Sequence, residues 1–116
     1  MMARLFGLRA PAQTISARTA YDMQQSNGLI IIDVRTSAEW AETGTPRKAR
    51  RLTLNSPGFL DTLPNDATPM ALTCLHGPRA QTAAKQLAKA GSTQLFVIKG
   101  GITAWTQAGL PLDRAH

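Results

Sequence analysis

The chain has 116 residues, of which 43% are hydrophobic and 17% charged, and this composition predicts one globular domain and excludes a disordered polymer. The net charge of +6 predicts a basic surface, which either attracts small anions or is merely well solvated. Aromatic residues make up only 5%, no nucleic-acid-binding motif is found and no apolar run is long enough to span a bilayer, so we expect neither nucleic acid nor a membrane as partner.

Residues 1–13 contain Arg4, Arg9 and Pro11 and no acidic residue. An arginine-rich, acid-poor composition is typical of a transit-type presequence as well, whereas the long apolar core of a secretory signal is missing. We interpret this segment as a flexible N-terminal leader on a cytoplasmic protein, followed by one folded domain over residues 14–116.

The domain opens with signals for a helix and a buried strand. Residues 14–27 begin extended and continue as a helix, for which Ser16 is the expected N-cap. The uninterrupted apolar run 29–32 is typical of a strand that is covered on both faces, as in a parallel sheet. Asp33 closes this run.

A second helix is predicted by a capping box. Residues 36–39 read Thr-Ser-Ala-Glu, in which the first and last side chains can each satisfy the other's backbone N–H. The helix is expected to extend to about residue 43. Arg35 and Glu39 are close enough in the sequence to form an ion pair.

The densest concentration of charge follows, and we call its four residues the basic cluster: Arg47, Lys48, Arg50 and Arg51. The cluster either docks an acidic partner or nucleic acid, or forms a solvated loop that leads into a strand at residues 52–54, and we favour the loop. Further on, Ser56 as N-cap and Pro57 at the first helical position predict a short helix that reaches Leu63. Residues 64–69 predict a polar turn.

The next segment contains a strand, a loop and a helix in close succession. The apolar run 70–73 predicts the strand, and Gly77 with Pro78 predicts a loop after it. From Pro78 or the residue after it the pattern is helical, and Gly91 is the expected stop. The face predicted to be buried consists of Ala80, Ala83, Ala84 and Leu87.

Residues 95–98 form another apolar run of strand type, Gly100 and Gly101 predict a turn, and residues 102–108 predict a last short helix. Trp105 is expected to be a core residue. Because strands alternate with helices along the chain, we expect an α/β fold with a mostly parallel central sheet and helices on both faces.

Cys74, the only cysteine, stands where a strand ends and just before a helix begins. A helix N-terminus presents unpaired N–H groups and a partial positive charge, and both favour a thiolate, which is the nucleophilic form. Arg79 adds a permanent cation, and the loop between the two residues can turn its N–H groups inward as an anion cradle. We therefore predict a reactive cysteine; the alternative is a buried structural one.

At these residues the sequence resembles the single-domain rhodanese family of sulfurtransferases. The family's reactive loop runs from a cysteine over four residues to an arginine, as Cys74 to Arg79 do here. Two further segments resemble family motifs in the same order, and the resemblance spans about residues 14–112. These are Asp33-Val34-Arg35 with Glu39, and Gly100-Gly101 with Ala104-Trp105 and Ala108-Gly109-Leu110-Pro111. The resemblance implies a rhodanese-like three-layer domain.

The resemblance also implies an activity. Cys74 would attack the sulfane sulfur of thiosulfate or a similar small anionic donor, carry it as a persulfide, and pass it to a nucleophilic acceptor such as cyanide or a thiol. No cofactor is implied beyond this covalent intermediate, and one cysteine with two histidines argues against a metal site. Related phosphatases have a reactive loop that is one residue longer, which admits a tetrahedral oxyanion.

The resemblance assigns roles residue by residue. Cys74 is the expected catalytic residue, and the loop expected to contact the substrate is Leu75, His76, Gly77, Pro78 and Arg79. The residues expected to be structural are Asp33, Arg35, Glu39, Gly100, Gly101 and Trp105. Arg79 is expected either to hold the donor or to brace the loop. His76 either donates a proton, contacts the substrate or is merely an exposed loop residue, and we favour the last. Pro78 has no N–H, so the cradle lacks a donor there.

A second hypothesis is a non-catalytic binding or sensor module, since rhodanese-like domains also serve in that way. A persulfide carrier that delivers sulfur to one protein acceptor lies between the two hypotheses. The presence of Cys74 favours the enzyme.

Overall fold

The computed structural model describes residues 12–64 and 66–114. The predicted leader lies outside the described residues except for Ala12 and Gln13, and Gln13 is the first residue of β1. In chain order the elements are β1 (Gln13–Ile15), α1 (Ala17–Ser26), β2 (Ile30–Asp33), α2 (Ser37–Thr43), β3 (Thr45–Pro46), β4 (Arg50–Arg51), β5 (Met70–Thr73), α3 (Pro78–Lys89), β6 (Leu95–Ile98), α4 (Gly101–Gln107) and β7 (Leu112–Asp113).

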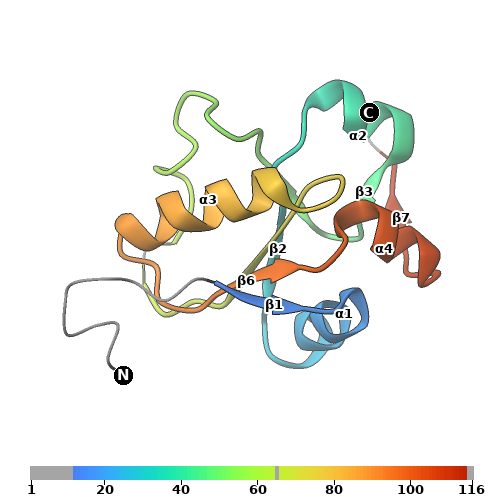
Figure 1. The fold of residues 1–116 in the computed structure, drawn as a ribbon, viewed down its shortest axis with the longest axis horizontal. Helices are drawn as coiled ribbons and strands as arrows, with labels where there is room; N and C mark the ends of the chain where they lie inside the picture. The colour runs from blue at the N-terminus through green and yellow to red at the C-terminus, as the bar shows by residue number, and fades with distance from the viewer. Residues whose placement is uncertain (1–11, 65, 115–116) are drawn as a thin grey trace.

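The centre of the fold is a parallel sheet in the order β1-β6-β5-β2-β4. Helix α3 covers one face, and α1 and α4 cover the other (Figure 1). β5 is in the middle and pairs with β6 on one side and with β2 on the other, where Asp33 stands opposite Thr73. The predicted α/β architecture with a mostly parallel sheet is confirmed.

Side chains alternate between the two faces of the sheet and fill two separate cores. On β5, Met70 and Leu72 pack toward α3, whereas Ala71 packs toward α1 and α4. All three are fully buried, which is why the strand is apolar without interruption. The predicted inner face of α3 is also confirmed, since the four side chains that meet the sheet are Ala80, Ala83, Ala84 and Leu87.

The N-caps predicted for α1 and α2 are confirmed. Ser16 accepts a hydrogen bond from the backbone N–H of Thr19 at 3.0 Å. Thr36 accepts one from the N–H of Glu39 at 3.3 Å, while the Glu39 carboxylate accepts from the N–H of Thr36 at 3.1 Å. Pro78 is the first residue of α3, as expected. These local signals depend on a few neighbouring residues, which is why the sequence alone reveals them.

The strand predicted at residues 52–54 is wrong. The strand that joins the sheet is β4, which consists of two exposed arginines of the basic cluster and pairs with the end of β2. The N–H groups of Leu52 and Leu54 still donate to the carbonyls of Asp33 and Val34 at 2.9 and 3.0 Å, but residues 52–54 do not continue as a strand. Leu52 and Leu54 still pack against the core on the α3 side.

The short helix predicted from Ser56 to Leu63 is also wrong. This segment is a series of turns, in which the N–H of Phe59 donates to the carbonyl of Ser56 at 3.0 Å and the N–H of Asp61 to that of Gly58 at 3.1 Å. Gly58 has φ +75°, which interrupts a right-handed helix. The Ser56 hydroxyl donates backward to the carbonyl of Thr53 and so does not act as the predicted N-cap.

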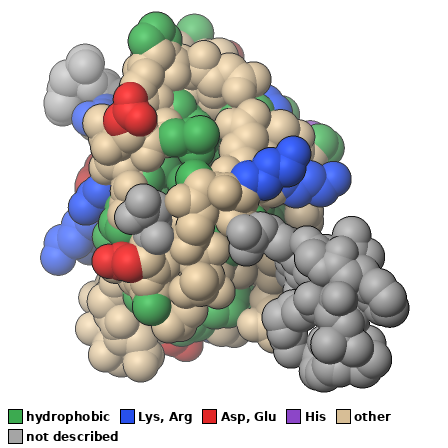
Figure 2. Space-filling model, turned by 90° about the vertical axis from the view of Figure 1, so that its left-hand side faces the viewer, with side chains coloured by type: hydrophobic (Ala, Val, Ile, Leu, Met, Phe, Trp, Pro, Cys, Tyr) green, Lys and Arg blue, Asp and Glu red, His purple; other side chains and the backbone are tan. Residues whose placement is uncertain are grey.

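A small antiparallel ribbon was not predicted. β3 pairs with β7 and so joins the segment after α2 to the end of the described chain. The basic cluster follows β3, and Arg47 lies 3.9 Å from Asp113, with both side chains about half exposed. None of the described helices is long and apolar enough to cross a membrane. On the face in Figure 2, hydrophobic side chains emerge in separate groups among polar ones.

Candidate active site

Cys74 follows the last residue of β5 and lies at the carboxyl end of the central strand. Its side chain is 1% exposed, and its sulfur accepts a hydrogen bond from the backbone N–H of Gly77 at 3.1 Å. Burial by itself is equally typical of a structural cysteine. The amide directed at the sulfur is the feature that a site for an anionic sulfur needs, because it stabilises negative charge there.

The reactive loop, residues 74–79, is held on one side by the start of α4. The N–H of Ile102 donates to the carbonyl of Cys74 at 2.8 Å, and that of Thr103 to the carbonyl of Leu75 at 3.4 Å. A Cβ on Gly101 would overlap both carbonyl oxygens. Gly101 is therefore required for the close approach of α4 to the loop, which explains the second glycine of the predicted turn.

The middle of the loop faces outward. Leu75 is 38% exposed, which is unusual for a large hydrophobic side chain, and His76 is exposed as well. The Nδ1 atom of His76 lies 3.4 Å from the hydroxyl of Thr103. Gly77 has φ +145°, a conformation that side chains rarely adopt, and it precedes Pro78 at the start of α3. Among the loop amides, the Gly77 N–H is therefore the one that points at the sulfur, and Pro78 has none to offer.

Arg79 is bound to Glu39, not free in the loop. Its two terminal nitrogens contact the two carboxylate oxygens of Glu39 at 2.7 and 2.9 Å. Hydrogen bonds from the Arg79 side chain, aided by the amide and hydroxyl of Thr36, lower the pKa of Glu39 to about 2, so that the pair stays ionised well into the acidic range. The ion pair predicted between Arg35 and Glu39 is wrong, because each of these side chains has another partner.

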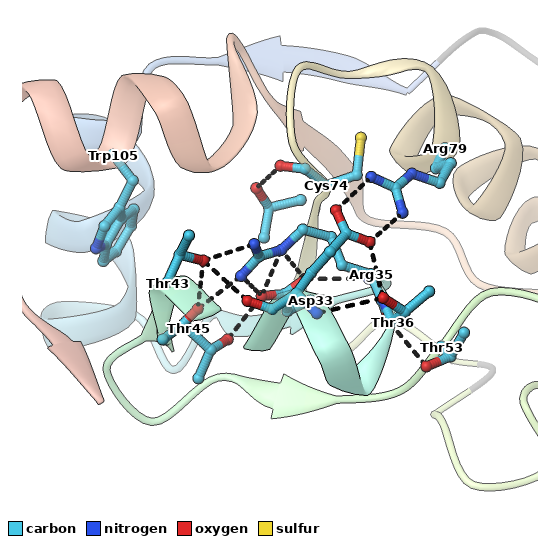
Figure 3. A network of polar contacts seen from close by, with 12 residues as sticks. Asp33, Arg35, Thr36, Thr43, Thr45, Thr53, Cys74, Arg79 and Trp105 are labelled. Carbon is cyan, nitrogen blue, oxygen red and sulfur yellow. Dashed lines mark hydrogen bonds and ion pairs between the residues drawn. The ribbon is translucent and has the colours of Figure 1, made fainter. Parts of the chain in front are cut away.

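Arg35 pairs with Asp33 in a buried network below the loop (Figure 3). The guanidinium contacts both carboxylate oxygens of Asp33 at 2.8 to 3.2 Å, and the two side chains are 1% and 0% exposed. Three further groups complete the network, namely the hydroxyls of Thr43 and Thr45 and the carbonyl of Gly44. Sequence reasoning missed the two threonines, whose roles depend on where the end of α2 and the start of β3 lie relative to Asp33 and Arg35.

Trp105 lies away from the loop, in the core between the sheet and α1. It is fully buried, its Nε1–H donates to the carbonyl of Pro111 at 2.8 Å, and its ring meets that of Tyr21 edge to face. The prediction that Trp105 is a core residue is confirmed. Within residues 12–64 and 66–114, no group of three or more His, Cys, Asp or Glu side chains could hold a metal ion.

The fold is similar to that of several solved structures. A rhodanese-related protein from Thermoplasma volcanium superposes with a TM-score of 0.77 over 89% of this chain and 99% of that chain, at 22% identity. The polysulfide-sulfur transferase of Wolinella succinogenes superposes with a TM-score of 0.75 over 98% of this chain and 88% of that one, at 28% identity. The first likeness establishes the fold alone.

Sequence relatives lead to the same family. A thiosulfate sulfurtransferase GlpE from Actinobacillus pleuropneumoniae is 30% identical over 103 residues, which cover 88% of this chain and 94% of that protein. The protein of the same name from Actinobacillus succinogenes is 34% identical, with 88% and 91% covered. The model of the rhodanese-like domain matches residues 16–108, which include the cysteine loop, the Asp33–Arg35 pair and the glycine pair. On this match and on its fold, the chain belongs to the family of rhodanese-like domains.

Proposed function

We propose that the protein is a sulfurtransferase that moves a sulfane sulfur from thiosulfate or a similar anionic donor to cyanide or a thiol. The Cys74 thiolate attacks the outer sulfur of thiosulfate, a new S–S bond forms, and sulfite leaves with the electron pair of the bond that breaks. The acceptor then attacks the outer sulfur of the persulfide, and the Cys74 thiolate leaves. The covalent persulfide takes the place of a cofactor.

The observation that carries the proposal is the Gly77 N–H, 3.1 Å from the Cys74 sulfur at the carboxyl end of β5. Sites in parallel sheets open at this end of the strands. A fixed amide directed at the sulfur would stabilise the negative charge of a thiolate or a persulfide without reorganising during the reaction. The two Actinobacillus relatives are named as thiosulfate sulfurtransferases, which supports the same chemistry.

Loop length favours sulfur over phosphorus as the atom transferred. Four residues separate Cys74 from Arg79, one fewer than in the related phosphatases. Pro78 has no N–H, so the cradle also has one hydrogen-bond donor fewer. A tetrahedral oxyanion needs several donors around it, whereas a single sulfur atom needs fewer. His76 is exposed and is given no part in the chemistry.

A binding module, or a persulfide carrier for a protein acceptor, is the second hypothesis. The exposed Leu75, one residue from the sulfur, would suit contact with a protein acceptor. The cytoplasmic location stays a prediction, as does the division into a leader and a domain from residue 14.

The test is turnover. The purified protein should form thiocyanate from thiosulfate and cyanide and should leave an aryl phosphate ester unchanged. Hydrolysis of the ester without thiocyanate formation would contradict the proposal in favour of a phosphatase. Inactivity toward both substrates, and toward organic persulfides, would favour the binding module.

A further inference from the structure

Glu39 joins the beginnings of two helices, α2 and α3, next to the reactive loop. Its Oε1 atom accepts from the N–H and the hydroxyl of Thr36, both at 3.1 Å, and from Nη1 of Arg79 at 2.7 Å, while its Oε2 atom accepts from Nη2 of Arg79 at 2.9 Å. Thr36 caps α2, and Arg79 is the second residue of α3. One carboxylate therefore ties the N-terminus of α2 to that of α3 (Figure 3).

Few other contacts fix the loop from outside. On the α4 side, the N–H groups of Ile102 and Thr103 hold the carbonyls of Cys74 and Leu75. Among the loop side chains, hydrogen bonds to other elements of the described chain are made by His76 and Arg79 alone, and the contact of His76 is long at 3.4 Å. On the side of the loop that ends in α3, the bond between Arg79 and Glu39 is therefore the principal polar restraint from outside, in addition to the packing of Ala80 on the sheet.

This restraint lies next to the amide that faces the sulfur. Gly77, whose N–H contacts the Cys74 sulfur, is two residues before Arg79, and its carbonyl accepts the N–H of Gln81 in the first turn of α3. Any shift of the first turn of α3 would move the Gly77 backbone with it. Because the hydrogen bond to sulfur depends on the placement of that backbone, its geometry depends on the contact between Arg79 and Glu39.

The same contact limits what Arg79 can do for a substrate. Each carboxylate oxygen of Glu39 receives one terminal nitrogen of the guanidinium, in a bidentate pair that leaves little net charge. A thiosulfate ion would have to displace a carboxylate that is already bound at hydrogen-bond distance. The loop's only arginine is therefore committed before any donor arrives.

We propose that Glu39 is a positioning residue that acts through Arg79, and that the pair orients the Gly77 amide toward the sulfur instead of binding the donor. This inference rests on the proposed sulfurtransferase function, since sulfur loading is what it explains. Arg79 then does not discriminate between donors of different charge.

The test compares Glu39→Gln and Arg79→Gln with the matched control Thr36→Ala. Glutamine at position 39 keeps an acceptor for the capping box but loses the ion pair, whereas Thr36→Ala weakens the cap and keeps the pair. Sulfur loading of Cys74 is measured with thiosulfate, a dianion, and with benzenethiosulfonate, a monoanion. Hydrogen exchange of residues 75–81 is measured without any donor.

We expect Glu39→Gln and Arg79→Gln to slow loading by both donors by the same factor, roughly ten- to a hundredfold, as for a small misplacement of a reacting group. The double variant should be no slower than either single variant, and amide exchange in the loop should be faster in all three. Thr36→Ala should load at the wild-type rate per folded molecule, with unchanged exchange in the loop.

Four results would overturn the inference. A loss confined to thiosulfate in Arg79→Gln, or faster thiosulfate loading in Glu39→Gln, would make Arg79 a receptor for the donor's charge. If Glu39→Gln and Thr36→Ala had the same rate of sulfur loading and the same hydrogen exchange in the loop, the pair of Glu39 and Arg79 would stabilise the fold without positioning the loop. Failure of the wild-type chain to take sulfur from either donor would overturn the proposed function, and this inference with it.

Discussion

Replacement of Cys74 by serine is expected to abolish thiocyanate formation from thiosulfate and cyanide while the fold stays intact. The hydroxyl is a poor nucleophile at neutral pH and cannot form a persulfide, and no second cysteine is present to substitute for it. Serine is only slightly smaller than cysteine, and its oxygen can accept the hydrogen bond from the Gly77 N–H that the sulfur accepts in the wild-type protein. The assay is thiocyanate release, normalised to folded protein by circular dichroism.

Cys74→Ala separates the two contributions of the side chain. It removes the nucleophile together with the acceptor for the Gly77 N–H, so it should be as inactive as Cys74→Ser and somewhat less stable. Sulfur transfer at the wild-type rate in a folded serine variant would remove Cys74 from the mechanism. Only the conclusion that the chain has a rhodanese-like fold would then remain.

Asp33→Asn is expected to have the largest effect on stability. It removes one charge of an ion pair whose two side chains are 0% and 1% exposed, and so leaves the Arg35 guanidinium as a buried charge without a counter-charge. Breaking such a pair costs about 3–5 kcal/mol, a large part of the about 5–15 kcal/mol that holds a typical domain together. Urea titration followed by circular dichroism measures the loss.

Arg47→Ala is the matched control, because it also removes one partner of an ion pair, but of an exposed one. Arg47 lies 3.9 Å from Asp113, and both side chains are about half exposed. Such surface pairs contribute about 0–1 kcal/mol, so this variant should unfold close to the wild-type midpoint. An Asp33→Asn variant as stable as Arg47→Ala would show that the buried network is not a major support of the fold.

The elements that could be predicted from the sequence are those with local signals. The inner face of α3 and the capping box of α2 depend on residues within one or two helical turns of each other. The apolar strands β2, β5 and β6 depend on runs of consecutive residues. The position of Cys74 at the end of a central strand followed from the same patterns. For this reason the general location of the site was available before the structure.

Contacts between residues far apart in the sequence could not be predicted in this way. Glu39 was predicted to pair with Arg35, four residues away, and instead pairs with Arg79, because α2 and α3 begin side by side only in the folded sheet. The ribbon of β3 and β7 joins segments that no local pattern connects. β4 was misplaced because an edge strand of two exposed arginines has no apolar pattern to reveal it.

The helix predicted over residues 56–63 was wrong for a different reason. Ser56 and Pro57 are a valid start signal for a helix, but Gly58 adopts a positive φ directly afterwards, and the apolar residues Phe59 and Leu63 reach the core from a series of turns. Start signals of this kind predict where a helix can begin. They do not show whether enough consecutive residues follow to sustain it.

The most direct test of the central claim is the mass of the protein after exposure to thiosulfate. The protein is incubated with the donor, freed of excess, and measured intact without reductant. The account predicts a species heavier by one sulfur atom, with the sulfur located at Cys74, which disappears on addition of cyanide as thiocyanate is released. An unchanged mass with thiosulfate and with organic persulfides would contradict the proposed sulfur transfer.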